Sequence, residues 1–139
     1  MVIEKRDIVI VINSRNQMFV NKRRKDRRLY PNFYGFGAGG RIEKGETPFK
    51  AARRELAEET RLKDKPKFLF RYKFSEFGTY QYIYEVITDR KIDNFEDEWQ
   101  WSDWMEFDEV DKLSKRGKLA PDSTITYKKY RNLKKLNPL

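Results

Sequence analysis

Three glutamates are spaced so that they share one edge of a single predicted helix. Glu55, Glu58 and Glu59 fall within an arc of about 100° when their segment is wound at roughly 100° per residue. Carboxylates crowded in this way repel one another, so the cluster persists where water screens the charges or where a hard cation sits among the oxygens. The sequence therefore predicts either a solvated acidic helix face or a divalent-metal site.

The segment that carries these glutamates is typical of an amphipathic helix. Thr47 suits the N-cap position, and Pro48 suits the first helical position, where its missing N–H costs nothing. We expect the helix to end near Thr60. One apolar stripe runs along it, at Phe49, Ala52 and Leu56.

A longer pattern surrounds this helix. Gly40 is followed after five residues by Glu46, then after seven by Arg54-Glu55-Leu56-Ala57-Glu58-Glu59, and Leu62 closes the pattern. This resembles the Nudix box of the Nudix hydrolases: Gly, five residues, Glu, seven residues, Arg-Glu-aliphatic-any-Glu-Glu-any-Gly-aliphatic. Every fixed position matches except the last glycine, which is Arg61.

The resemblance implies a role for each residue of the motif. Arg54 would orient helix carboxylates rather than touch substrate, because it lies one turn from Glu58 and Glu46 can reach back to it. An ordinary loop carboxylate is the alternative for Glu46. The implied ligands of Mg²⁺ or Mn²⁺ are Glu55, Glu58, Glu59 and the Gly40 carbonyl.

The sequence does not identify the general base. In some members of the family it is a helix glutamate, here Glu55 or Glu58, and in others a distal carboxylate on a later loop. Glu98 is the distal candidate, with Glu96 and Asp97 as rivals. A plain acidic loop would account for the same three residues.

Substrate-binding residues are proposed on either side of the motif. Arg23 resembles the family arginine that contacts phosphate, although a surface cation would look the same. Phe36 and Tyr82 are candidates for stacking on a base, and a place in the core is the alternative for both. Three further rings share that ambiguity: Tyr72, Phe74 and Tyr80.

The replacement of the motif glycine by Arg61 has a backbone consequence. The glycine follows the last helical turn, where a left-handed conformation is easiest for glycine. Arg61 therefore either adopts positive φ, at roughly 1–2 kcal/mol, or the chain leaves the helix by another path. The short connection to Pro66 favours the strained stop. On a helical wheel Arg61 projects about 20° from Arg54, which would add positive charge near bound phosphates.

Composition narrows the chemistry. The chain has no cysteine and no histidine, which excludes disulfides, thiol nucleophiles, Ser-His-Asp catalysis and histidine metal ligands. The net charge of +9 is uneven: +6 over residues 1–36, −4 over residues 37–110 and +7 over residues 111–139. Basic ends around an acidic middle fit a metal-and-phosphate site, a weak attraction to RNA or a solvated surface. No signal sequence or apolar run of membrane length is present, so we expect a cytoplasmic location and no membrane partner.

The pattern of elements predicts one α/β domain over residues 1–139. Strands are expected at residues 8–12 and 18–20, joined as a hairpin, and at 68–74, 79–87 and 99–107. Short helices should follow at residues 108–114 and 121–136, the latter with a stripe of Ile125, Tyr130, Leu133 and Leu136. The resemblance, extended to flanking segments, implies the Nudix-type α/β/α sandwich with a mixed β-sheet.

Three functions are compatible with these residues. The first is a metal-dependent hydrolase that cleaves the diphosphate linkage of a nucleoside diphosphate bound to another moiety: a nucleoside triphosphate, a nucleotide sugar or an ADP-ribose type of molecule. The second is a hydrolase of RNA 5′ ends, and the third a non-catalytic nucleotide- or RNA-binding module. The complete set of motif carboxylates disfavours the third. A homodimer is left open.

Overall fold

The architecture was obtained as a computed structural model, which describes residues 4–74, 78–92 and 99–136. The strands and helices expected from the sequence are present in the expected order, and two further short strands precede the first helix. Within the described residues, no helix combines the length and apolar character needed to cross a bilayer. The elements are β1 (Lys5–Ile12), β2 (Gln17–Arg23), β3 (Tyr34–Phe36), β4 (Ala38–Arg41), α1 (Pro48–Thr60), β5 (Lys67–Phe74), β6 (Thr79–Ile87), β7 (Trp99–Glu106), α2 (Phe107–Lys115) and α3 (Pro121–Leu136).

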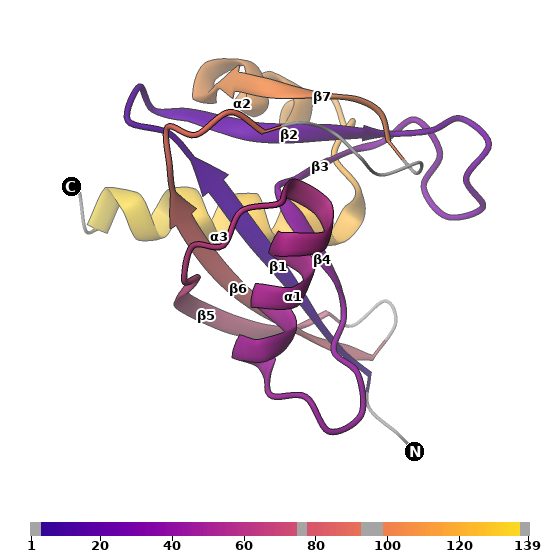
Figure 1. Cartoon of the computed structure of the whole chain (residues 1–139). Coiled ribbons are helices and arrows are strands. Elements are labelled where there is room, and N and C mark those ends of the chain that lie inside the picture. The colour runs from indigo at the N-terminus through magenta and orange to yellow at the C-terminus, as the bar shows by residue number, and fades with distance from the viewer. Residues whose placement is uncertain (1–3, 75–77, 93–98, 137–139) are drawn as a thin grey trace.

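A mixed sheet runs through the molecule, with α1 on one face and α3 on the other (Figure 1). The main strand order is β3-β2-β1-β6-β5, while β4 pairs with β1 and β7 pairs with β2. β1 and β6 are parallel along their whole length, and the other pairs are antiparallel. β1 is covered on both faces, which explains its continuous aliphatic run. The predicted α/β/α sandwich is confirmed.

The expected hairpin between β1 and β2 is reduced to a corner. The two strands pair only at Ile12 and Met18, because β2 turns away to pair with β3 and β7. Asn13 fixes the corner, since its Oδ1 accepts the backbone N–H groups of Arg15 and Gln17, both at 3.0 Å. This divergence leaves both edges of β1 available, one to β4 and the other to β6.

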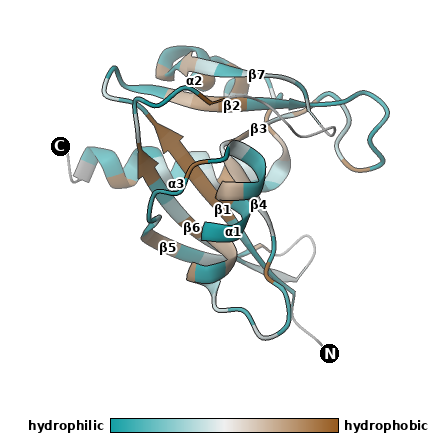
Figure 2. Cartoon of the chain, viewed as in Figure 1, coloured by the Kyte–Doolittle hydropathy of each residue, from teal (hydrophilic) through white to brown (hydrophobic). Residues whose placement is uncertain are grey.

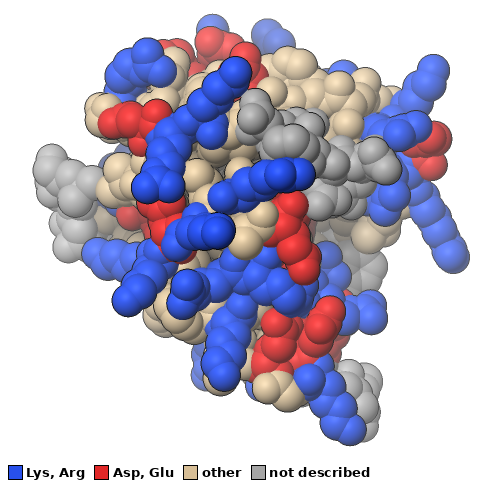
Figure 3. Space-filling view, in the orientation of Figure 1, with Lys and Arg blue, Asp and Glu red and all other residues tan. Residues whose placement is uncertain are grey.

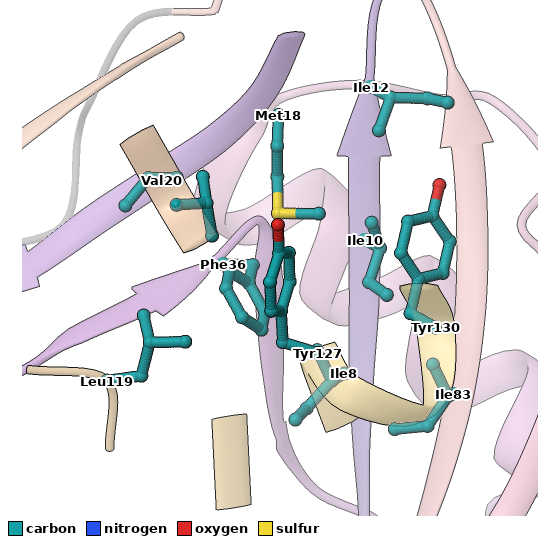
Figure 4. Close-up of a cluster of buried hydrophobic side chains, with 11 residues drawn as sticks. Ile8, Ile10, Ile12, Met18, Val20, Phe36, Ile83, Leu119, Tyr127 and Tyr130 are labelled. Carbon is teal, nitrogen blue, oxygen red and sulfur yellow. The ribbon is translucent and has the colours of Figure 1, made fainter. Parts of the chain in front are cut away.

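Two hydrophobic clusters lie on opposite faces of the sheet, and Figure 2 shows the apolar strand β1 between them. Val9 and Val11 pack with Ala52 and Leu56 beneath α1. On the other face, α3 buries Tyr130 as predicted, together with Tyr127, while Ile125 and Leu133 of the predicted stripe are only partly covered. Figure 4 shows this second cluster, drawn from Ile8, Ile10, Ile12, Met18, Val20, Phe36, Ile83, Leu119, Tyr127 and Tyr130.

Helix α1 begins and ends as its sequence predicts. The Thr47 hydroxyl accepts the N–H of Lys50 at 3.2 Å, and Pro48 is the first helical residue. Arg61 has φ 63° and ψ 12°, in the left-handed region, and donates its N–H to the Ala57 carbonyl at 2.9 Å. The strained stop is therefore the path that the chain takes.

Replacing Arg61 by glycine should stabilise the protein by about 1 kcal/mol or less. Glycine removes the cost of ~1–2 kcal/mol that a left-handed conformation imposes on arginine. It also gives the unfolded chain more conformational entropy, which lowers the free energy of unfolding by ~0.4–1 kcal/mol. Thermal melts measure the effect. Arg53→Gly, at an exposed interior position of the same helix, is the control and should destabilise by about 1 kcal/mol. A lower Tm for Arg61→Gly would contradict the strain account.

Candidate active site

Arg54 lies among the carboxylates of α1 and of the loop before it. Its Nε and Nη2 donate to the two oxygens of Glu46 at 2.7 and 2.9 Å. Its Nη1 donates to Glu55 at 2.9 Å and to Glu58 at 3.4 Å. The Arg54 hydrogen bonds, with one from the backbone N–H of Glu43, lower the pKa of Glu46 to about 2. Glu46 contacts Arg54 as expected from the sequence. The Arg54 guanidinium also holds Glu55 and Glu58 side by side.

Glu55 packs against the backbone of β4 at Gly40. The Glu55 side chain is 12% exposed, and a Cβ atom added at Gly40 would lie 2.8 Å from its Oε1 and 3.0 Å from its Cδ. A side chain at this position would displace the Glu55 carboxylate, so glycine here permits the observed position of Glu55. The Gly40 backbone and the Glu55 carboxylate are therefore close neighbours, as a shared metal site needs.

The two remaining glutamates of the motif differ in their surroundings. Glu59 is buried, and its Oε2 accepts the backbone N–H of Gly39 at 3.1 Å. The Glu58 side chain is 55% exposed, so it can change rotamer without unpacking the core. Among the described residues, no three carboxylates already converge as a cation cage. The donor set nevertheless fits Mg²⁺ or Mn²⁺, because all its atoms are the oxygens that hard cations prefer.

A fourth carboxylate, Asp7 on β1, belongs to this group and was missed by the sequence analysis. It pairs with Gly40 across the β1–β4 ladder and is 1% exposed. Burial and the nearby charge of Glu55 raise the pKa of Asp7 to about 7, although the Gly40 N–H and the Arg54 guanidinium lower it in part. The only signal in the sequence was a charged residue immediately before the aliphatic run of β1.

A cavity of about 520 Å³ adjoins these residues. Gly39, Gly40 and Glu59 lie at its edge, which connects it to the carboxylates. Its remaining walls come from β1, β2, β3, β5, β6, β7, the segment around Leu29 and the start of α3. The lining includes aromatic and cationic side chains: Arg6, Arg23, Arg41, Tyr30, Tyr34, Phe36, Phe74 and Trp99. Such an arrangement suits a flat ring linked to an anion.

Two polar side chains of β6 are buried in the cavity wall. Thr79 and Gln81 are each 1% exposed, and both line the cavity. Within the described parts of the chain, the Thr79 hydroxyl and the Gln81 Oε1 have no hydrogen-bond partner. Buried polar atoms are costly when unpaired, so a bound molecule is a natural partner for them. Their signal in the sequence was two polar residues, two apart, in a strand otherwise rich in aromatic and aliphatic residues.

Comparison with known proteins identifies the family. The sequence profile described as NUDIX domain matches residues 4–129. The chain belongs to the Nudix family. An uncharacterized Nudix hydrolase of Listeria monocytogenes is 35% identical over 79 residues, which are 54% of this chain and 47% of that protein. The chain thus spans about half the length of this relative.

Solved structures of other proteins share the fold. DR0079 from Deinococcus radiodurans has a TM-score of 0.76 at 21% identity, covering 91% of this chain and 82% of that one. The NUDIX domain of Shewanella oneidensis NrtR, solved with ADP ribose, has a TM-score of 0.75 at 13% identity, covering 95% and 88%. At these identities the likeness supports the sandwich fold alone.

Other residues expected from the Nudix resemblance are distributed over the molecule. Arg23 and Phe36 both line the cavity, and Arg23 donates its Nε to the Leu29 carbonyl at 2.8 Å. Arg61 is exposed and does not line it. Tyr82 lies instead on the α1 side of β6, across from Arg71. The distal base candidates Glu96, Asp97 and Glu98 lie outside the described residues.

Among the other rings considered for stacking, only Phe74 lines the cavity. Tyr72 packs against α3, where its hydroxyl contacts Thr126 at 2.7 Å and donates to the Asp122 carbonyl at 2.9 Å. Tyr80 lies on the same sheet face as Tyr82. The core alternative therefore holds for Tyr72.

The buried Asp7 of the Nudix site predicts a pH-dependent stability. Between pH ~4 and ~7 the folded protein keeps the Asp7 proton, because its pKa is about 7, while the unfolded chain, with the ordinary aspartate pKa of 3.8, loses it. Stability therefore falls as pH rises through this window. Asp7→Asn, which is neutral throughout, should match the parent near pH 4 and exceed it by up to about 4 kcal/mol near pH 8.

Denaturant unfolding of both proteins in EDTA, at several pH values across this window, measures the difference. EDTA keeps divalent cations away from the neighbouring Glu55. Parallel pH profiles for the parent and Asp7→Asn would contradict the prediction.

Proposed function

We propose that this chain is a Mg²⁺- or Mn²⁺-dependent hydrolase that cleaves the diphosphate linkage of a nucleoside diphosphate bound to another moiety. The observation that supports it best is that Glu59, Gly39 and Gly40 line the 520 Å³ cavity, with the Glu55 carboxylate packed against Gly40. A substrate ring in that cavity could extend its phosphates past Gly39 and Gly40 toward Glu59. The structural neighbour solved with ADP ribose supports a nucleotide derivative as the substrate.

Each carboxylate of the site has a proposed role. Arg54 and Glu46 orient the helix glutamates, as their hydrogen bonds support. A bound divalent cation would neutralise charge on the phosphate oxygens and lower the pKa of a water ligand. The residues proposed to hold it are Glu55, Glu58, Glu59 and the Gly40 carbonyl.

The general base that activates the attacking water is one of several carboxylates. Glu98 is our proposal for it, and Glu55, Glu58, Glu96 and Asp97 are the alternatives. Loss of a general base typically lowers kcat by ~10²–10⁴-fold. Glu98→Gln should therefore lower kcat by this factor, with less effect on metal affinity than Glu59→Gln. Parental kcat in Glu98→Gln would move the role to Glu55, Glu58, Glu96 or Asp97.

Different residues of the cavity wall suit different parts of the proposed substrate. Arg6 and Arg23 bring two guanidinium groups to its walls, and these suit the phosphates. Phe36 and Phe74 offer rings for a base or a ribose. Gln81 presents an amide, which can accept from one edge atom of a base and donate to the next.

The metal-ligand proposal is tested with Glu59→Gln. The glutamine keeps an oxygen that can accept the Gly39 N–H, so the fold should persist while one ligand charge is lost. Turnover should fall by more than the ~10–100-fold typical of indirect ligand-orienting residues, and Mn²⁺ affinity should fall in calorimetry. Glu109→Gln on α2 is the control and should behave like the parent. Parental turnover of Glu59→Gln at saturating Mg²⁺ would show that the site lies elsewhere.

The substrate-recognition proposal is tested with Gln81→Leu. Because the Gln81 Oε1 has no partner in the described protein, the variant should unfold at the same temperature as the parent or higher. Its KM should rise by about 2–10-fold for the preferred nucleotide, the cost of one hydrogen bond, with kcat nearly unchanged. If Gln81 has a purely structural role, Gln81→Leu should instead show a lower Tm and an unchanged KM.

A further inference from the structure

One face of the sheet carries rings and cations side by side beyond the edge of α1. The register of β5 and β6 sets Phe68 beside Tyr84, Arg71 beside Tyr82 and Lys73 beside Tyr80. These side chains lie on the α1 side of the two strands, whereas α1 itself packs over β1 and β4 (Figure 1). We call this surface the aromatic-cationic face, made up of Phe68, Arg71, Lys73, Tyr80 and Tyr82.

The opposite side of the same strands is different. Phe70 and Tyr72 pack against the cluster beneath α3, together with Ile83. The side chains of β5 and β6 that face α3 therefore form part of the hydrophobic core. The rings on the aromatic-cationic face are not part of the cluster beneath α3. Phe68 is 50% exposed, and Tyr80 and Tyr82 are partly exposed. Single exposed rings are common on proteins, but a contiguous group of them indicates a binding surface.

Arg71 links the rings into one arrangement. Its guanidinium lies 5.5 Å from the centroid of the Tyr80 ring, and its Nη1 lies 3.4 Å from the Tyr82 hydroxyl. The Phe68 and Tyr82 centroids are 6.5 Å apart. Within the described parts of the chain, neither Arg71 nor Lys73 forms a salt bridge with a carboxylate. Both positive charges can therefore pair with an external anion.

The charge of this face is one-sided. None of the positions that β5 and β6 present on it is Asp or Glu. Figure 3, viewed from the α1 side, shows Lys and Arg side chains gathered over the part of the molecule that carries α1 and β5. Side chains two apart on a strand are spaced by about 7 Å, so successive rings can each take a flat group. Rings for flat groups and cations for a repeating anion together match single-stranded nucleic acid.

We infer that the aromatic-cationic face binds single-stranded nucleic acid, with bases stacked on Phe68, Tyr80 and Tyr82 and phosphates on Arg71 and Lys73. None of these five side chains lines the cavity described above. Binding on this face is therefore independent of the proposed hydrolysis, and each can be lost without the other.

The test is a fluorescence-anisotropy titration with labelled oligouridine of about 12 nucleotides, within the ~4–16 nucleotides that comparable surfaces cover. EDTA is present so that no hydrolysis interferes. Phe68→Ala should weaken binding about five- to hundredfold, the effect of losing one stacked base. Arg71→Gln should weaken it and reduce the slope of log Kd against log salt by about 0.7, the value for one phosphate on a single strand.

Two matched controls lie elsewhere on the surface. Trp101→Ala removes a ring of similar exposure, 39%, from β7, and Lys115→Gln removes an exposed cation at the end of α2. Both should bind oligouridine like the parent. An oligomer of abasic nucleotides separates stacking from charge, because Phe68→Ala should not change its affinity. Phe68→Ala should also keep the parental rate on a small nucleotide.

Three results would overturn the inference. Parental binding by Phe68→Ala and Arg71→Gln would remove this face from the interaction. Equal losses in Trp101→Ala and Phe68→Ala would show a diffuse attraction to the whole basic surface. Sedimentation showing a dimer that Phe68→Ala dissociates would assign the rings to an interface between two copies of the chain.

Discussion

The ion pairs around Arg54 allow several carboxylates to lie close together in one site. Four carboxylates, from Asp7, Glu55, Glu58 and Glu59, lie on or beneath α1, and their mutual repulsion would favour another arrangement. Arg54 offsets part of this repulsion with a group that stays charged at any ordinary pH. Its fork grips Glu46 with two hydrogen bonds while its other nitrogen reaches Glu55. One side chain thus ties the loop before α1 to the helix and sets the direction of its glutamates.

The second constraint is the position of β1 between β4 and β6. Because strand residues alternate, Asp7 faces α1 and Ile8 faces α3. The carboxylates therefore gather on one side of the sheet and most of the cavity on the other. Gly39 and Gly40 allow the two to meet, since added Cβ atoms would lie 2.4 Å from the Asp7 carbonyl oxygen and 2.8 Å from Glu55. Small residues in β4 thus bring the proposed reacting centre next to the cavity.

The sequence predicted what local spacing controls. The cap at Thr47, the left-handed stop at Arg61 and the pairing of Glu46 with Arg54 all depend on neighbours in the chain or on one helix. Asp7 was missed because its surroundings depend on β1 pairing with β4, more than 30 residues later, and Thr79 and Gln81 because theirs depend on β6 pairing with β1, more than 70 residues earlier. Alternation predicts that Tyr82 and Gln81 lie on opposite faces, but not which face meets the cavity. An irregularity between Phe68 and Phe70 also breaks the alternation in β5, so Phe68 and Arg71 share a face.

The strained backbone of Arg61 at the end of α1 positions the residues on either side of it. The stop at Arg61 turns the chain so that Leu62 is 3% exposed, and the Thr60 hydroxyl supports the turn by accepting the Leu62 N–H at 3.2 Å. Burying a leucine contributes about 1.5–3 kcal/mol, which exceeds the ~1–2 kcal/mol cost of a left-handed arginine. An anchored end also fixes the rotation of the last helical turn about its axis. Glu59 lies in that turn, so its contact with Gly39, and through it the alignment of the proposed metal ligands with the cavity, depends on where the helix stops.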